Sequence, residues 1–257
     1  MIKEQEFLAR YNSKSTIGNY RQVLKRFSQW RDEVPEKNLW TKDYIDHLIK
    51  SGVSNKTINY HLTVLSKYRQ YLGGEKILFD RLKEKPAVTD FLTDDEIKLL
   101  LWESEPPIRA MIRVMLDTGC RVAELEHLSR QVFDSVPKEV QIVGKGLKQR
   151  VVLLSDEARE LLGKTMKNGL LFGEVLTVRK VQHRLKKFAE WIGFKKRLHP
   201  HIFRHTFATH MLWGGADITE VKEMLGHSYL STTERYTHIT QERIKEVWER
   251  VFKNRII

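Results

Sequence analysis

The sequence of 257 residues contains a single cysteine, Cys120, and only 6 prolines. One cysteine excludes a disulfide within the chain and suits a reducing compartment. No apolar run reaches the length of a membrane span, and the residues after Met1 lack the apolar core of a secretory signal peptide. We therefore expect a cytoplasmic protein that has no membrane partner.

Acidic residues are too few to balance the basic ones. Lys and Arg total 45 against 33 Asp and Glu, which gives a formal net charge of +12. The surplus is spread over both halves of the chain rather than held in one tail. A basic surface attracts polyanions, so the charge favours a nucleic-acid partner. A basic soluble protein with no such partner would have the same composition.

The first third of the chain has apolar residues at helical spacing. These sets end at Ser51-Gly52 and at Gly73-Gly74, and they predict a small bundle of about four helices. We interpret the aromatic residues of these sets as core, and the lysines and arginines between them as contacts to phosphate. Pro86 and the capping box that begins at Thr93 place a domain boundary at about residue 86. The expected domains are 1–85 and 86–257.

Two features of the second domain suit contact with an anion. Arg121 follows the turn at Thr118-Gly119 and begins a helix, where an arginine is well placed to face an anion. The alternative is a salt bridge between Arg121 and Glu124 and nothing more. Farther along, two β-branched runs, 140–143 and 150–153, flank a glycine-containing turn and predict a β-hairpin. Lys145 would stand at its tip, where a solvated lysine is the ordinary alternative.

The stretch from Leu198 to Ile239 concentrates the remaining chemistry. Pro200 suits the first turn of a helix on which His201 and Arg204 share a face, and Gly214-Gly215 ends that helix. A second short helix ends at Gly226 and is followed by His227, and a capping box at 231–234 introduces Tyr236. An arginine fork matches phosphate oxygens, histidine exchanges protons near neutral pH, and tyrosine can form an ester to phosphorus. Together they suit phosphoryl transfer.

The order of these pieces resembles the tyrosine recombinases, the phage-integrase family, and most of all its Xer-type members. The resemblance rests on five segments, which are TGCRVAEL at 118–125, GKG at 144–146, HIFRH at 201–205, LGH at 225–227, and Tyr236. The N-terminal bundle resembles the family's core-binding domain. The fold implied is mainly α with a small β-hairpin or sheet in the C-terminal domain, that is, a helical DNA-clamping bundle followed by an α+β catalytic domain.

The resemblance also implies roles for individual residues in cleaving and rejoining double-stranded DNA. Arg121 and Arg204 would bind the non-bridging oxygens of the scissile phosphate, and His227 would hydrogen-bond it. Lys145 would protonate the departing 5′-hydroxyl, and His201 would assist proton transfer at the tyrosine. Tyr236 would be the nucleophile and would form a 3′-phosphotyrosine. Further implications are a supporting role for Glu124 and a reaction that needs no cofactor or metal.

The closing helix, at about 240–252, is amphipathic. The residues of its apolar face are Ile244, Val247, Trp248 and Val251. One alternative is that this face packs on its own domain. We favour docking on a neighbouring protomer in a homotetramer on paired DNA sites, because the helix would otherwise expose an apolar face.

Three other functions remain open from the sequence. The same residues would serve a type IB topoisomerase-like enzyme that relaxes DNA without strand exchange. A DNA-binding accessory protein would need none of them. A zinc protein is conceivable because four histidines are crowded between His199 and His210, although the chain lacks an H-E-x-x-H motif and cysteine pairs.

Overall fold

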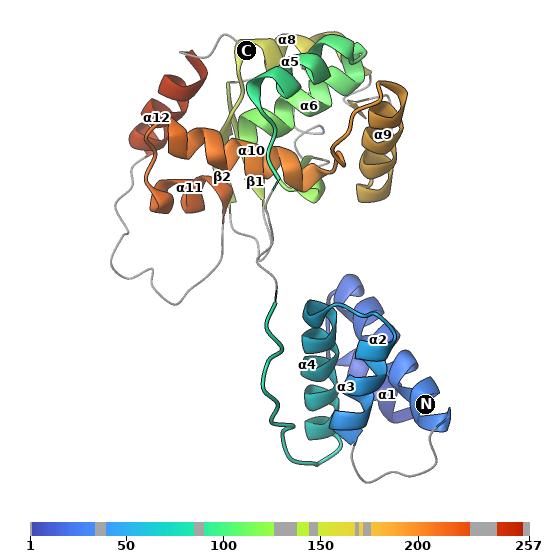
Figure 1. Cartoon of the computed structure of the whole chain (residues 1–257). Helices are drawn as coiled ribbons and strands as arrows, with labels where there is room; N and C mark the ends of the chain where they lie inside the picture. The colour runs from blue at the N-terminus through green and yellow to red at the C-terminus, as the bar shows by residue number, and fades with distance from the viewer. Residues whose placement is uncertain are drawn as a thin grey trace. The chain divides into compact units, whose positions relative to one another are not determined.

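The computed structural model describes residues 2–33, 40–84, 90–125, 138–143, 149–167, 170–171, 176–226 and 241–253 (Figure 1). The chain divides into two compact units, Met1–Ala87 and Val88–Ile257, and each is described by itself. Most of the described residues are helical, and the strands form only two-stranded antiparallel sheets. The predicted fold class, mainly α with a small β-hairpin, is confirmed.

The first unit is a bundle of helices. Its elements are α1 (Ile2–Ala9), α2 (Lys14–Glu33), α3 (Trp40–Lys50) and α4 (Asn55–Tyr71). Aromatic side chains fill its core, as predicted, and Tyr44 and Phe7 are among the largest fully buried ones. The Tyr44 hydroxyl pairs with Nδ1 of His61 at 3.0 Å, which satisfies both polar groups inside the core.

Irregular chain follows α4 and is tied to that helix. The side chain of Asn59 donates to the carbonyl of Leu82 at 2.9 Å and accepts the Leu82 N–H at 2.9 Å. The N–H of Ile77 donates to the hydroxyl of Ser66 at 3.1 Å. Residues 77–82 therefore belong to the first unit.

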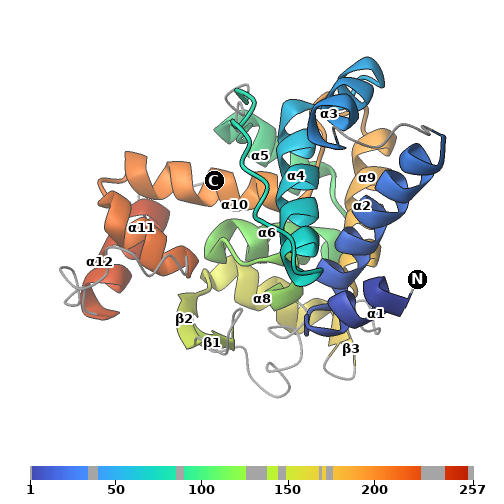
Figure 2. The same cartoon turned by 90° about the horizontal axis from the view of Figure 1, so that it is seen from below.

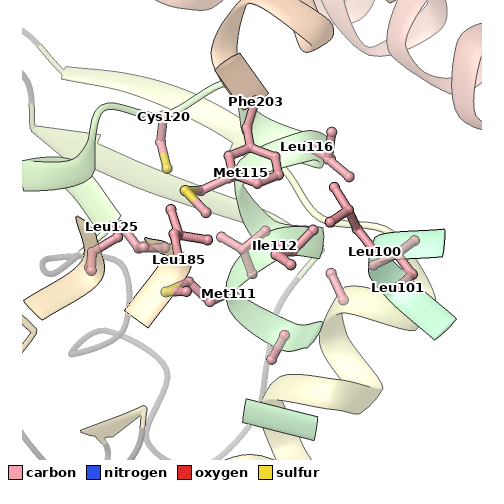
Figure 3. Close-up of a cluster of buried hydrophobic side chains, with 14 of the residues drawn as sticks. Leu100, Leu101, Met111, Ile112, Met115, Leu116, Cys120, Leu125, Leu185 and Phe203 are labelled. Atoms are coloured by element: carbon pink, nitrogen blue, oxygen red, sulfur yellow. The ribbon is translucent and has the colours of Figure 1, made fainter. Parts of the chain in front are cut away.

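The second unit is arranged around α6. Its elements are α5 (Asp94–Glu103), α6 (Pro106–Thr118), β1 (Glu139–Val143), β2 (Gln149–Leu153), α8 (Asp156–Thr165), β3 (Met166–Lys167), β4 (Leu170–Leu171), α9 (Val178–Trp191), α10 (Pro200–Trp213), α11 (Ile218–Leu225) and α12 (Gln241–Lys253). Helices α5, α8 and α10 pack against α6. Figure 3 shows the resulting core, in which Met111, Ile112 and Met115 of α6 lie among residues from α5, α9 and α10. Such a helix, covered on several sides, is a rigid base for the turn that follows it.

Two antiparallel strand pairs accompany these helices. Strands β1 and β2 form the predicted hairpin, with Ile142 opposite Arg150 and Val140 opposite Val152. Its turn, residues 144–148, lies outside the described residues. The pair β3–β4 was not predicted, because strands of two residues leave no periodic signal in a sequence.

Helix α12 packs on its own domain, and the expectation that its apolar face would be exposed in a single chain is wrong. Its buried residues are Ile244, Val247, Trp248 and Val251. They form one cluster with side chains of α10 and α11, including Phe207 and Met211. In both views α11 and α12 gather at the same end of α10 (Figures 1 and 2). The physical reason is that α10 and α11 present apolar side chains there, which α12 covers.

Within the described part of the chain, every helix is too short or too polar to cross a membrane.

Candidate active site

Helix α10 carries two of the predicted site residues. Pro200 occupies the first turn, as predicted, and the ring of His199 caps the helix by accepting the Ile202 N–H at 3.2 Å. His201 is exposed near this end, whereas Arg204 is buried one turn later. The helix therefore presents an accessible imidazole and a buried guanidinium.

Arg204 joins two segments that are distant in sequence. Its Nη1 donates to the carbonyl of Gly119 at 2.7 Å, and its Nη2 donates to the carbonyl of Leu225 at 2.7 Å. Gly119 ends α6, and Leu225 ends α11. Because carbonyls at a helix C-terminus carry partial negative charge, a cation stabilises both ends.

Arg121 reaches the same place from the turn after α6. Gly119 makes that turn with a φ of 56°, a left-handed conformation that glycine adopts readily. A Cβ atom at Gly119 would lie 2.6 Å from the ring of Phe207, so the turn is also pressed against α10. Nη2 of Arg121 donates to the carbonyl of Gly226 at 3.0 Å. Arg121 and Arg204 thus bind adjacent carbonyls at the end of α11.

Glu124 holds Arg121 in that position. Its carboxylate accepts the Arg121 N–H at 2.7 Å and the Arg121 Nη1 at 2.8 Å. The Arg121–Glu124 salt bridge considered as an alternative is therefore present, and it occurs together with the convergence of the arginines. The Arg121 side chain keeps 31% of its surface exposed, so it remains open to a ligand.

Arg150 is a site residue that the sequence interpretation missed. Both of its terminal nitrogens donate to Glu124, Nη2 to Oε2 at 2.8 Å and Nη1 to Oε1 at 3.2 Å. A signal was available, because Arg150 and the buried Val152 are two apart on β2 and project from the same face of the strand. An arginine on the core side of a strand requires a charged partner, and Glu124 is that partner.

Two guanidinium groups therefore bind one carboxylate, and a third, that of Arg204, interacts with it electrostatically. Burial first, and then the charges of Arg121 and Arg150, lower the pKa of Arg204 to about 10. Burial by itself would raise the pKa of Glu124, but hydrogen bonds from Arg150 and Arg121 outweigh that effect and keep its pKa below the ordinary value. Positive charge is in excess at a partly open position, which is the environment that an anion requires.

Three other predicted site residues cannot be located relative to the arginines. Lys145, His227 and Tyr236 lie outside the described residues, as does the capping box at 231–234. His227 directly follows Gly226 in the chain, and Arg121 binds the carbonyl of Gly226. Helix α11 begins at Ile218 and ends at a left-handed Gly226, in agreement with the short helix predicted there.

The crowded histidines serve different purposes. His199 caps α10, and His210 is buried with Nε2 at 3.6 Å from Oδ1 of Asp94. Among the residues that the structure describes, no three His, Cys, Asp or Glu side chains gather as metal ligands would.

Comparison with known proteins shows the family of the chain. The profile of the phage integrase family matches residues 90–243, and that of the phage integrase N-terminal SAM-like domain matches residues 5–76. The chain belongs to the phage integrase family. It is 33% identical to the tyrosine recombinase XerD of Staphylococcus aureus over 92% of each chain. Identity to the tyrosine recombinase XerC of Thermodesulfovibrio yellowstonii is 30%, over 95% of this chain and 92% of that one.

Solved structures share the fold of this integrase-family chain. The Tn1549 transposon integrase in complex with transposon right end DNA matches with a TM-score of 0.72 and 17% identity, over 96% of this chain and 97% of that one. The XerH recombinase in a post-cleavage complex matches with a TM-score of 0.66 and 22% identity, over 94% of this chain and 81% of that one. The predicted membership of the tyrosine recombinases, enzymes of site-specific recombination, is confirmed.

Proposed function

We propose that this tyrosine recombinase cleaves and rejoins double-stranded DNA through a covalent 3′-phosphotyrosine on Tyr236. The observation that carries the proposal is the convergence of Arg121 and Arg204 on the end of α11, directly before His227 in the chain. Two guanidinium groups at one partly open position suit the two non-bridging oxygens of a phosphodiester. Preorganised cations of this kind are usually the largest source of transition-state stabilisation.

The proposed reaction uses each residue at a defined atom. The phenol oxygen of Tyr236 attacks phosphorus, and its proton passes to His201. The bond between phosphorus and the 5′-oxygen breaks, and Lys145 supplies the proton that this oxygen takes up. Arg121 and Arg204, with His227, bind the oxygens on which negative charge develops. The reverse steps on a partner strand release Tyr236 and restore a phosphodiester.

Buried Arg204 and partly exposed Arg121 suit different parts of this task. Arg204 is fixed by two carbonyls, so its position costs little reorganisation when DNA binds. Arg121 is more exposed, and Glu124 holds it from behind the accessible surface. Glu124 thereby acts as a positioning residue in the proposed mechanism.

The partners follow from the same proposal. DNA is bound in the solved complexes of the Tn1549 integrase and XerH, and the excess of basic residues in this chain suits the same partner. We assign DNA clamping to residues 1–85 and catalysis to residues 86–257, and we place the protein in the cytoplasm. Exchange of DNA between paired sites requires several protomers, and a homotetramer is proposed. Because α12 covers its own domain, its use as a contact between protomers would require exchange of the helix.

Trapping of the covalent adduct tests the proposal. The protein is incubated with random-sequence duplexes that carry a nick, so that the short product strand diffuses away after cleavage and religation is blocked. Sequencing of the DNA ends attached to protein then identifies the target. We expect an adduct on the 3′-phosphate side of a common sequence, and joined products when two such duplexes are supplied intact.

The matched control is Tyr236→Phe, which removes only the attacking oxygen. This variant is expected to bind the recovered duplex like the unmodified protein and to form no adduct. An adduct with Tyr236→Phe would show that another residue is the nucleophile. Relaxed plasmid without any joined duplexes would instead indicate a topoisomerase-like activity.

A further inference from the structure

Arg150 lies at the meeting point of three segments of the second unit. It belongs to β2, it donates two hydrogen bonds to Glu124 in the helical residues 122–125, and it lies against the end of α11. A Cβ atom added to Gly226 would lie 2.9 Å from Nη1 of Arg150. The segment between β1 and β2 contains Lys145, and the segment after Gly226 begins with His227. One side chain therefore connects β2, Glu124 and the end of α11.

The contact with Glu124 has the geometry of a positioning device. A bidentate pair of hydrogen bonds between a guanidinium and a carboxylate fixes both groups in one plane, whereas one hydrogen bond does not. The Glu124 carboxylate is then shared, because it also accepts the backbone and side-chain N–H groups of Arg121. Any rotation of Glu124 would move Arg121.

Burial separates the roles of the two arginines. The side chain of Arg150 is 11% exposed, against 31% for Arg121. Its Nε–H is buried and has no hydrogen-bond partner within the described part of the chain. A buried donor without a partner destabilises the fold, so packing alone does not account for an arginine at this position.

We infer that Arg150 is a positioning residue for recombination, which orients Glu124 and through it the phosphate-binding Arg121. The inference rests on the proposed function of Arg121. Arg150 also adds positive charge beside Arg204, which increases the attraction of the site for an anion. Its role differs from those of the six residues proposed to act on DNA, because both of its terminal nitrogens donate to Glu124.

The test measures the first-order rate of adduct formation at saturating protein, on the nicked duplex recovered with the unmodified protein. Arg150→Gln is compared with Arg159→Gln, which removes an arginine from an exposed ion pair with Asp156 in the same unit. We expect Arg150→Gln to bind the duplex within a few-fold of the unmodified protein and to react about 100-fold more slowly, as a misplacement of about 1 Å at a reacting group would cause. Arg159→Gln should react at the unmodified rate.

The pH profile separates positioning from a general structural effect. Glu124 faces Arg121 and Arg150, with Arg204 and the Cys120 thiol nearby. Without Arg150, the Glu124 carboxyl loses the hydrogen bonds that lower its pKa most, and only those from Arg121 still oppose the effect of burial. The pKa of Glu124 should therefore rise, and the adduct rate of Arg150→Gln should fall additionally as the pH is lowered. Arg150→Lys keeps a charge but not the fork, and should react slowly with the unmodified pH profile. Arg150→Gln with an unchanged rate, or with a uniformly scaled profile, would overturn the inference.

A double variant covers the case in which Arg150→Gln does not fold. Glu124→Gln/Arg150→Gln removes both charges of the Glu124–Arg150 pair, so neither member of that pair is left as a buried ion without the other. If Arg150 acts through Glu124, adding Arg150→Gln to Glu124→Gln should slow the reaction by less than a few-fold. A full further loss would contradict the inference. An unmodified protein that forms no adduct would end the proposed function itself, and the role of Arg150 with it.

Discussion

Truncation of Trp248 tests whether α12 is part of its own domain. The Trp248 side chain is 5% exposed, and its Nε1 donates to the carbonyl of Asp117 at 2.8 Å. Its ring stacks on that of Phe252 at 4.5 Å between centroids. Trp248→Ala removes all three interactions, whereas Trp248→Phe removes chiefly the hydrogen bond. Trp102, which is 82% exposed on α5, supplies the matched control.

The expected loss of stability follows from burial. A buried tryptophan removes about 150–250 Å² from water, which at about 25 cal/mol per Å² amounts to roughly 4–6 kcal/mol. Measured Trp→Ala changes in cores cost about 3–5 kcal/mol, so we expect Trp248→Ala to lower the free energy of unfolding by about 4 kcal/mol. Trp248→Phe should cost about 1–2 kcal/mol, from the unsatisfied carbonyl and the smaller ring. Trp102→Ala should stay within about 0.5 kcal/mol.

Urea unfolding, followed by circular dichroism, gives these free energies. The measurement is made at two protein concentrations that differ about 50-fold. If α12 packs on its own domain, the losses are independent of concentration. If it docks on a neighbour, the free energy of unfolding changes by about 2.3 kcal/mol between the two concentrations, by mass action.

Two results would refute the reasoning. A loss below about 1 kcal/mol for Trp248→Ala would mean that the side chain is not buried in the folded chain. A strong dependence on concentration in the unmodified protein would mean that a neighbour provides the partner surface. Either result would restore the interpretation drawn from the sequence.

Two further predictions concern the turn after α6. Gly119→Ala should lower the free energy of unfolding by about 1–2 kcal/mol because of the left-handed backbone at this position, and by roughly 1–3 kcal/mol more from overpacking against Phe207. Gly163→Ala, in the last turn of α8 and with open space around its Cβ position, should raise the free energy of unfolding by about 0.5–1 kcal/mol. Urea unfolding measures both changes. Glu124→Gln should cost about 3–5 kcal/mol at pH 7, because the buried arginines lose their counter-ion. The pKa of Glu124 in the folded state lies below its unfolded value, so the stabilisation from this carboxylate is complete above about pH 4.5 and disappears as the pH falls through the folded pKa. The difference in free energy of unfolding between Glu124→Gln and the unmodified protein should therefore be smaller at pH 4 than at pH 7. A difference that stays constant would contradict the charge pairing.

Local signals in the sequence were sufficient for the helices that carry the site. The capping box at Thr93 forms as predicted, with both of its hydrogen bonds present. Pro200 begins α10 and Gly226 ends α11, because ring geometry and left-handed φ are properties of single residues. The β1–β2 hairpin was predicted for the same reason, from alternation that a few residues display.

The sequence by itself determined the family, the helical class and the candidate residues, because motif order and short-range periodicity are written along the chain. Only the tertiary structure decided which of those residues meet. Arg121 and Arg204 converge because Gly119, Leu225 and Gly226 offer carbonyls at one place, and no local pattern encodes that meeting. The partner of an inward-facing arginine and the surface that covers an apolar helix are likewise set by contacts between distant segments, which is why Arg150 was missed and the packing of α12 was misjudged.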